Sequence, residues 1–326
     1  MSSRQLTLSG RLGAAGAYLV MFLFPALAAA QALPATPPTT PPATPPLAAQ
    51  NPSPMAEESR AHERLIQKTL RGTTRTFDGP LNKPVEVFVP DRARGRDMVN
   101  VVITFHSTAW LAKQAVTSTD NRAVTAALNL GSGSGAYHRP FADPAAFDTL
   151  LAAISREVST VSGKPTAFGK ITLVGFSAGH GAIRAILLDA RHFKRVDAIL
   201  LLDGMHTSYV PEGVVLANGG TIDTTNLIAF RDFAHAAMRG EKDFVVTHSE
   251  IFPGTFVSTT ETANWLLHAI GVVRRPVLRW GPRGMQQLSE ARSGRLAVLG
   301  YAGNSAPDHI DQQHSMPELL ARLLKR

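Results

Sequence analysis

Short hydrophobic runs alternate with longer amphipathic stretches from about residue 85 to the C-terminus. Seven apolar runs, most of them rich in β-branched residues, predict strands at 85–89, 101–105, 124–130, 171–174, 196–202, 244–247 and 296–299. Helical spacing of apolar residues predicts helices at 143–160, 182–190, 226–239 and 316–325. A further helix is expected after Ser258, because Ser258 and Glu261 have the spacing of a capping box. Alternating strands and helices of this length predict an α/β fold, a mostly parallel central sheet flanked by helices.

The first 56 residues have a different pattern and are not expected to belong to this fold. Arg4 and Arg11 precede an apolar stretch at 14–30, which is followed by small residues of the A-x-A type, so residues 1–30 are predicted to be a secretory signal peptide. Nine of the 22 prolines fall within residues 34–54. Because proline fixes φ and donates no hydrogen bond, residues 31–56 are expected to be an extended linker. The folded domain is then predicted to span residues 57–326.

Composition excludes several classes of function. The chain has 326 residues and no cysteine, so it has neither disulfides nor thiolate chemistry. The net charge is +8, but there is no dense run of lysine and arginine and no basic stripe with interleaved aromatic residues, so no nucleic-acid partner is expected. After removal of the signal peptide no apolar segment is long enough to form a stable membrane span. No metal-binding motif is present, and no cofactor is expected.

The sequence Gly175-Phe176-Ser177-Ala178-Gly179 has the G-x-S-x-G pattern. It follows a predicted strand directly and precedes a predicted helix, which is the strand–turn–helix setting of a nucleophile elbow. Such a turn exposes the Ser177 side chain above the end of the strand. The N-terminus of the following helix favours negative charge developing nearby, and the Ala178 N–H can point at an oxyanion.

Because of this motif and its setting, the chain from about residue 80 to 326 resembles the α/β-hydrolase superfamily of serine hydrolases. The resemblance implies an oxyanion loop after the third strand, where this chain reads Phe105-His106-Ser107-Thr108-Ala109-Trp110, with Ser107 where glycine is usual. The N–H of Thr108 or Ala109 would be the second oxyanion donor. His106 is expected to support this loop through local hydrogen bonds.

The family order Ser–acid–His assigns the remaining catalytic roles. His309, in the loop expected between the last strand and the terminal helix, is the expected base, and His314, where the final helix is expected to begin, is the alternative. Two residues are candidates for the acid. Asp203 ends a very apolar strand and needs a strong partner there, and Glu250 follows the next strand. Glu261 is better explained by helix capping.

Three further residues are expected to line the substrate site: Trp110, Tyr137 as a stacking surface and Arg139 as a carboxylate contact. The glycine-rich segment 131–135 before Tyr137 is expected to be a loop, and its spacing fits neither dinucleotide nor P-loop motifs. Residues 205–225 are too short for a large lid, so a small cap or none is expected.

Together these features predict an exported serine hydrolase that cleaves a small-molecule or polymeric carboxylic ester through an acyl-enzyme. The alternatives are a peptidase or amidase of the same fold and a catalytically silent hydrolase fold that binds a surface ligand. A periplasmic or an extracellular location fits the linker equally well. The sequence specifies no oligomeric state.

Overall fold

The computed structural model describes residues 61–78, 81 and 83–324. The predicted signal peptide and almost all of the linker, including its proline-rich stretch, lie outside the described residues. The described residues belong to one compact unit, and they contain no helix long and apolar enough to cross a membrane.

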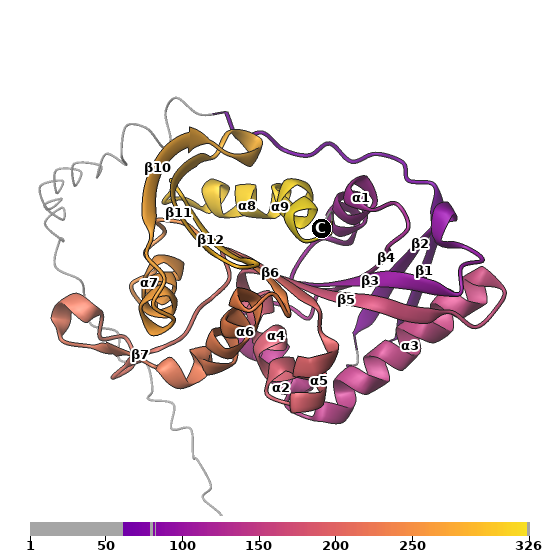
Figure 1. Cartoon of the computed structure of the whole chain (residues 1–326), viewed down its shortest axis with the longest axis horizontal. Coiled ribbons are helices and arrows are strands. Elements are labelled where there is room, and N and C mark those ends of the chain that lie inside the picture. Colours follow the sequence, from indigo (N-terminus) through magenta and orange to yellow (C-terminus); the bar gives the residue numbers. More distant parts are fainter. Residues whose placement is uncertain (1–60, 79–80, 82, 325–326) are drawn as a thin grey trace, which may run out of the picture. The chain divides into compact units, whose positions relative to one another are not determined.

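Ten strands form one sheet in the order β1-β2-β4-β3-β5-β6-β9-β12-β11-β10 (Figure 1). Their bounds are β1 Gly72–Asp78, β2 Pro84–Pro90, β3 Met98–Phe105, β4 Val124–Leu128, β5 Ala167–Phe176, β6 Ala198–Leu202, β9 Asp243–His248, β10 Arg275–Trp280, β11 Gln286–Ser293 and β12 Leu296–Tyr301. The central strands from β4 to β12 pair in parallel, whereas β1, β2, β11 and β10 pair antiparallel at the two sides. A separate two-stranded ribbon joins β7 (Tyr209–Val210) to β8 (Thr221–Ile222).

Nine helices accompany the sheet in the described part of the chain. They are α1 Ala109–Thr119, α2 Ser134–Phe141, α3 Pro144–Ser162, α4 His180–Leu187, α5 Ala190–Arg195, α6 Ile228–Met238, α7 Thr259–Ala269, α8 Ala306–His314 and α9 Met316–Leu324. Figure 1 shows α1, α8 and α9 on one face of the sheet and α2 to α6 on the other.

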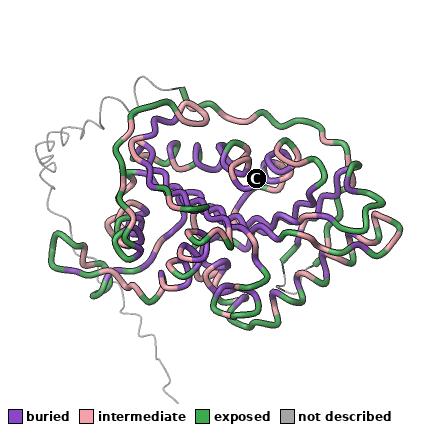
Figure 2. Tube along the Cα trace, in the orientation of Figure 1, coloured by how far each residue is buried: buried purple, intermediate pink, exposed green. Residues whose placement is uncertain are grey.

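The central strands are buried along most of their length (Figure 2), and β3, β5, β6, β9 and β12 each contribute side chains to two separate cores. Ile103, Leu173 and Ile199 point into the larger core beneath α2 to α6, while their neighbours Val174 and Leu200 point into the core with α1 and α9. Successive strand residues face opposite sides of the sheet, so a strand buried on both faces must be apolar throughout. This requirement explains the uninterrupted hydrophobic runs of the sequence.

All of the strands and helices predicted from the pattern are confirmed, with changed ends. The helix predicted at 182–190 is two helices, α4 and α5, separated where Asp189 caps the second. The Ser258–Glu261 capping box has both of its reciprocal hydrogen bonds.

Two segments expected to be loops contain helix. Residues 131–133 precede α2, as expected, but Ser134 and Gly135 belong to it. The segment that carries His309 is α8, so the loop expected there is wrong. Both helices contain proline and several polar residues, which weakened the periodic signal. The side strands β1, β10 and β11 were also missed. All residues of β10 are exposed or intermediate, so this strand has no apolar alternation to detect.

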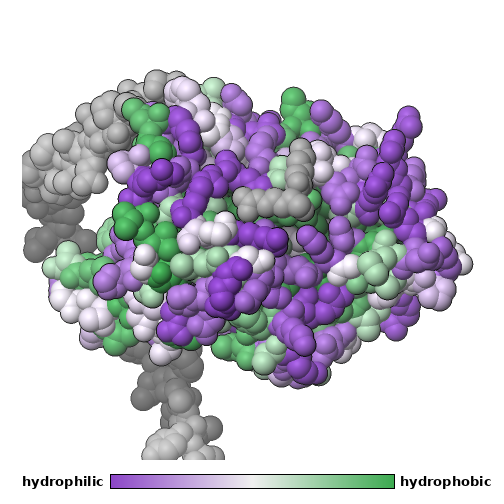
Figure 3. All heavy atoms as spheres, in the orientation of Figure 1, coloured by the Kyte–Doolittle hydropathy of each residue, from purple (hydrophilic) through white to green (hydrophobic). Residues whose placement is uncertain are grey.

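Hydrophobic residues on the face drawn in Figure 3 form small patches among hydrophilic ones. Leu278 and Trp280 of the edge strand β10 are among the exposed large apolar side chains, with charged Arg279 between them. Charged residues on an edge strand discourage pairing with another sheet.

Candidate active site

Three neighbouring parallel strands end in residues with a left-handed backbone. His106 follows β3 with φ 63°, Ser177 follows β5 with φ 47° and Asp203 follows β6 with φ 42°. Non-glycine residues rarely adopt positive φ, and such strain gathers at functional sites. Because parallel strands end at the same edge of a sheet, these three residues share one edge.

Ser177 lies in a sharp turn between β5 and α4, as the G-x-S-x-G motif predicts. The turn leaves no room for a side chain at Gly179 and little at Gly175. A Cβ on Gly179 would lie 2.3 Å from the Phe105 carbonyl oxygen, and one on Gly175 would lie 3.0 Å from Ile183 Cδ1. The turn therefore packs directly against the end of β3.

His180, at the start of α4, stabilises the same turn. Its Nδ1 lies 2.9 Å from the Ser177 carbonyl oxygen, and an N–H there donates to that oxygen. Burial lowers the pKa of His180 to about 3, with a further contribution from His206. The ring is therefore neutral at ordinary pH and acts as a structural donor.

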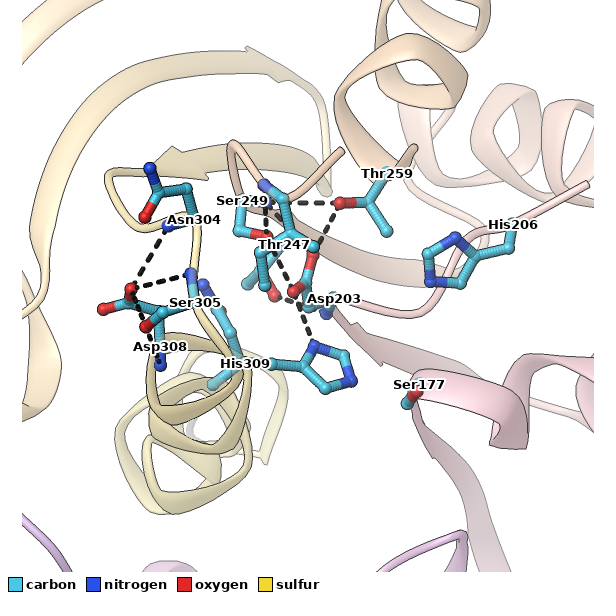
Figure 4. A network of polar contacts seen from close by, with 12 residues as sticks. Ser177, Asp203, His206, Thr247, Ser249, Thr259, Asn304, Ser305, Asp308 and His309 are labelled. Atoms are coloured by element: carbon cyan, nitrogen blue, oxygen red, sulfur yellow. Dashed lines mark hydrogen bonds and ion pairs between the residues drawn. The ribbon is translucent and has the colours of Figure 1, made fainter. Parts of the chain in front are cut away.

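The structure brings His309 and Asp203 together. His309 Nδ1 lies 2.7 Å from Asp203 Oδ2, although the residues are 106 positions apart. In Figure 4 the opposite side of the His309 ring faces Ser177. Asp203 is buried, with 1% of its surface exposed, whereas the His309 side chain is 24% exposed. An imidazole between a buried carboxylate and a hydroxyl is the arrangement that activates a serine.

Four donors hold the Asp203 carboxylate. Besides His309, these are the Ser249 N–H at 3.1 Å, the Ser249 hydroxyl at 2.8 Å and the Thr259 hydroxyl at 2.5 Å (Figure 4). Burial alone raises the pKa of Asp203, but the hydrogen bonds from His309 and Thr259 outweigh it and leave the pKa below its ordinary value. The carboxylate is therefore charged and oriented. Sequence reasoning missed Ser249 and Thr259, which have no motif.

The position of His309 follows from the start of α8. Ser305 is the N-cap of this helix, its hydroxyl is paired with the Asp308 N–H, and the Asp308 carboxylate accepts from the Ser305 N–H at 3.1 Å. His309 follows Asp308 in the first turn, and its ring lies 4.6 Å from the Phe176 ring. The serine, proline and aspartate at 305–308 are a capping signal that the sequence contains.

The alternative base and acid lie elsewhere. His314, in the last turn of α8, accepts a hydrogen bond from the Leu65 N–H at 2.9 Å and contacts the Trp110 ring. Glu250 is exposed, and Asp203 takes the position beside His309 instead. Glu261 accepts from the Ser258 N–H at 2.8 Å, so the capping interpretation is confirmed.

The residues expected to form the oxyanion hole lie at two helix starts. Ala178 is in the turn that leads into α4, and Thr108 is the N-cap of α1, so Ala109 is its first residue. The first N–H groups of a helix have no acceptor within the helix, which makes them available to an anion. The residue of this loop with positive φ is His106, not Ser107. Ser107 is buried and has an ordinary backbone conformation, so a glycine is not needed at that position.

His106 supports its loop as expected. Its N–H donates to the Leu128 carbonyl at 3.0 Å, and its Nδ1 lies 2.8 Å from the Tyr137 hydroxyl oxygen. Burial lowers the pKa of His106, with a further contribution from His309.

A cavity of about 500 Å³ opens beside Ser177. Its lining comes from the elbow, the start of α2, α4, the end of β3 and the segments around residues 206–208, 226 and 256. The lining residues are His106, Ser132, Gly133, Ser134, Ser177, Ala178, His180, Arg184, His206, Thr207, Ser208, Asn226 and Phe256. This volume is in the range of small-molecule sites.

The three residues expected to line the substrate site are not in the lining of this described cavity. Tyr137 is fully buried, and its hydroxyl binds His106 and the backbone of the preceding loop, so the stacking role is wrong. Arg139 is exposed on α2, and Trp110 packs beside His314. Arg184 is the arginine of the cavity.

One group of side chains in the described part of the chain has the spacing for a metal ion: His62, Asp308 and Asp311. Its members already hold each other and their neighbours. Asp311 lies 2.8 Å from His62 Nδ1 and 3.0 Å from Arg64, and Asp308 caps α8. The group therefore helps to attach residues 62–65 to α8.

The order of strands, the antiparallel β2, the elbow after β5 and the Ser–Asp–His order together define the α/β-hydrolase fold. No protein-family model and no curated protein match the sequence.

Several solved structures are similar in fold. The enterobactin esterase FES from Shigella flexneri, in the presence of enterobactin, is 9% identical with a TM-score of 0.49, covering 80% of this chain and 60% of that one. A mutant feruloyl esterase module from Clostridium thermocellum, complexed with sinapinate, is 11% identical with a TM-score of 0.44, covering 84% and 90%. The siderophore hydrolase EstB from Aspergillus nidulans is 13% identical with a TM-score of 0.42, covering 77% and 96%. At identities this low, the substrates of those proteins do not indicate the substrate of this chain.

Proposed function

We propose that this protein is an exported serine hydrolase that cleaves carboxylic esters, with Ser177 as nucleophile, His309 as base and Asp203 as the orienting acid. The observation that carries the proposal is the 2.7 Å contact between His309 and the buried Asp203, beside a serine in a strained elbow. The predicted signal peptide and linker support export to the periplasm or the medium.

The first half of the reaction forms the acyl-enzyme. His309 Nε2 takes the Ser177 proton as Oγ attacks the ester carbonyl carbon. The N–H groups of Ala178 and of Thr108 or Ala109 stabilise the oxyanion. The imidazolium, held by Asp203, then gives its proton to the leaving alcohol oxygen as the C–O bond breaks.

The second half releases the acid. His309 takes a proton from water, the hydroxide attacks the acyl-enzyme, and the same donors stabilise the second oxyanion. Collapse of this intermediate expels Ser177 Oγ, which regains its proton from His309, and the carboxylic acid leaves.

A fluorophosphonate probe tests the nucleophile. Wild-type protein is expected to be labelled within minutes, and Ser177→Ala and His309→Ala are expected to lose labelling, because an unactivated hydroxyl is a poor nucleophile. In parallel, 4-nitrophenyl butyrate and the matching 4-nitroanilide separate an esterase from an amidase. His314→Ala serves as the matched control and should retain labelling.

Absence of labelling in a folded wild-type protein would reject the hydrolase mechanism in favour of a binding module. Faster cleavage of the anilide would reassign the enzyme as a peptidase or amidase.

A further inference from the structure

Arg184 is the one arginine or lysine in the lining of the described cavity, and that lining contains no aspartate or glutamate. The cavity's other ionisable side chains are histidines, and burial lowers the pKa of His106, His180 and His206. The cavity therefore has a net positive charge that comes from a single guanidinium.

No hydrogen bond or ion pair with another described residue occupies the Arg184 side chain, and its Nε is buried without a partner. Asp223 interacts with it electrostatically, but the Asp223 carboxylate is engaged by the Asn226 side-chain amide at 2.6 Å and by the Thr225 N–H at 3.1 Å. A buried guanidinium N–H without an acceptor is costly, whereas a bound carboxylate would accept from two of its N–H groups at once.

Arg184 is placed to reach a group attached to the reacting carbonyl. It lies seven residues after Ser177 on the helix that starts at the elbow, so the two Cα atoms are roughly 10 Å apart along the axis. Side chains on a helix lean toward its N-terminus, which directs Arg184 toward Ser177. The end of an acyl chain of a few methylenes would fill this interval.

The cavity is on the acyl side of the ester. The leaving oxygen must face His309 to receive its proton, and His309 does not line the cavity, whereas Ser177 and the oxyanion donor Ala178 do. Phe256, which packs edge-on against His206 with ring centroids 5.0 Å apart, offers an apolar wall for the methylenes.

We propose that Arg184 binds a carboxylate at the far end of the acyl group, so that the preferred substrates are monoesters of dicarboxylic acids. This inference rests on the proposed function. It assigns to Arg184 the carboxylate contact that the sequence suggested for Arg139.

The test compares mono-4-nitrophenyl adipate with 4-nitrophenyl hexanoate, which differ only in a carboxylate or a methyl group at the chain end. Wild-type protein should have the higher kcat/KM for the adipate ester. Arg184→Met should lower kcat/KM for that ester at least ~tenfold and leave the hexanoate within about threefold, because a charged hydrogen-bonded pair is lost. Arg139→Met is the matched control and should change neither value.

Two further measurements guard against misfolding of Arg184→Met, the first on wild-type protein and the second on a variant that keeps the charge. In wild-type protein, added salt should lower kcat/KM for the adipate ester more than for the hexanoate. Arg184→Lys, which keeps the charge but not the planar fork, should fall between wild type and Arg184→Met.

The outcomes separate the two proposals. Hydrolysis of the hexanoate with no preference for the adipate ester and no effect of Arg184→Met overturns the role of Arg184 and leaves the esterase standing. If neither ester is cleaved, the proposed function fails, and calorimetry of adipate binding to wild type and Arg184→Met decides the role of Arg184 alone. Stronger inhibition of hexanoate cleavage by inorganic phosphate than by adipate would overturn the choice of a carboxylate.

Discussion

At the scale of single residues, the buried carboxylate is the most tightly specified group of the site. Asp203 is surrounded by donors from Ser249, Thr259 and His309, and its own N–H donates to the Thr247 hydroxyl at 3.0 Å. A buried charge is tolerated only with such partners, so each donor contributes both to stability and to the orientation of the imidazole.

Thr259→Val tests this positioning role. Loss of the Thr259 hydroxyl should raise the pKa of Asp203, because that hydrogen bond favours the charged form. We expect kcat/KM to fall by roughly 10-fold and its acid limb to move to higher pH. The pH profile of ester hydrolysis measures both effects.

Thr259→Ser keeps the hydroxyl and should restore the wild-type profile. A valine variant with an unchanged pH profile would make Thr259 a packing residue only.

At the scale of elements, the start of α8 links helix capping to catalysis. Ser305 and Asp308 cap the helix that carries His309 in its first turn. The cap therefore determines where α8 begins, and with it the place of His309 in the first turn of that helix.

Ser305→Ala should lower the free energy of unfolding by about 1 kcal/mol, the usual cost of losing an N-cap. It should also lower kcat several-fold, because fraying of the first turn displaces His309. Urea denaturation and steady-state kinetics measure the two effects.

Asp189→Ala is the matched control, since Asp189 caps α5 by accepting from the Arg191 and His192 N–H groups. It should cost similar stability without changing kcat. Equal kinetic effects of the two substitutions would refute a specific role for the α8 cap.

At the scale of the whole molecule, two buried histidines link stability to pH. Burial lowers the pKa of His180 and of His248 to about 3. In the unfolded chain a histidine has a pKa of about 6.5, so the unfolded state takes up protons first as the pH falls. Each residue therefore destabilises the fold between about pH 6.5 and 3, with a slope of up to ~1.4 kcal/mol per pH unit.

His248→Gln should make stability less dependent on pH in that window, because one of the buried imidazoles with a lowered pKa is removed. Unfolding free energies from urea titrations at a neutral and at a mildly acidic pH measure the change. His268→Gln, at an exposed position of α7, should keep the full dependence. If the wild-type protein had the same unfolding free energy at the two pH values, the burial of neutral imidazoles would be contradicted.

Much of the site could be predicted because its signals are local. The elbow glycines, the strand before Ser177 and the apolar strand ending in Asp203 are each encoded within a few residues. The order of serine, acid and histidine along the chain then follows the order of the strands.

Other features depended on contacts between distant segments. Asp203 and Glu250 both end strands at the same edge, and only the fold brings Asp203 next to His309. Likewise, α2 turns Tyr137 inward and Arg139 outward, so the arginine of the cavity is Arg184 from α4.

The sequence by itself determined the strands of the parallel core, most of the helices and the elbow that carries Ser177, because backbone preference and burial produce a periodic pattern of apolar residues. Tertiary structure alone decided which carboxylate lies beside His309, the donors to that carboxylate and the residues of the cavity. Those depend on the directions in which side chains from separate elements point, and no single segment of the chain encodes that geometry.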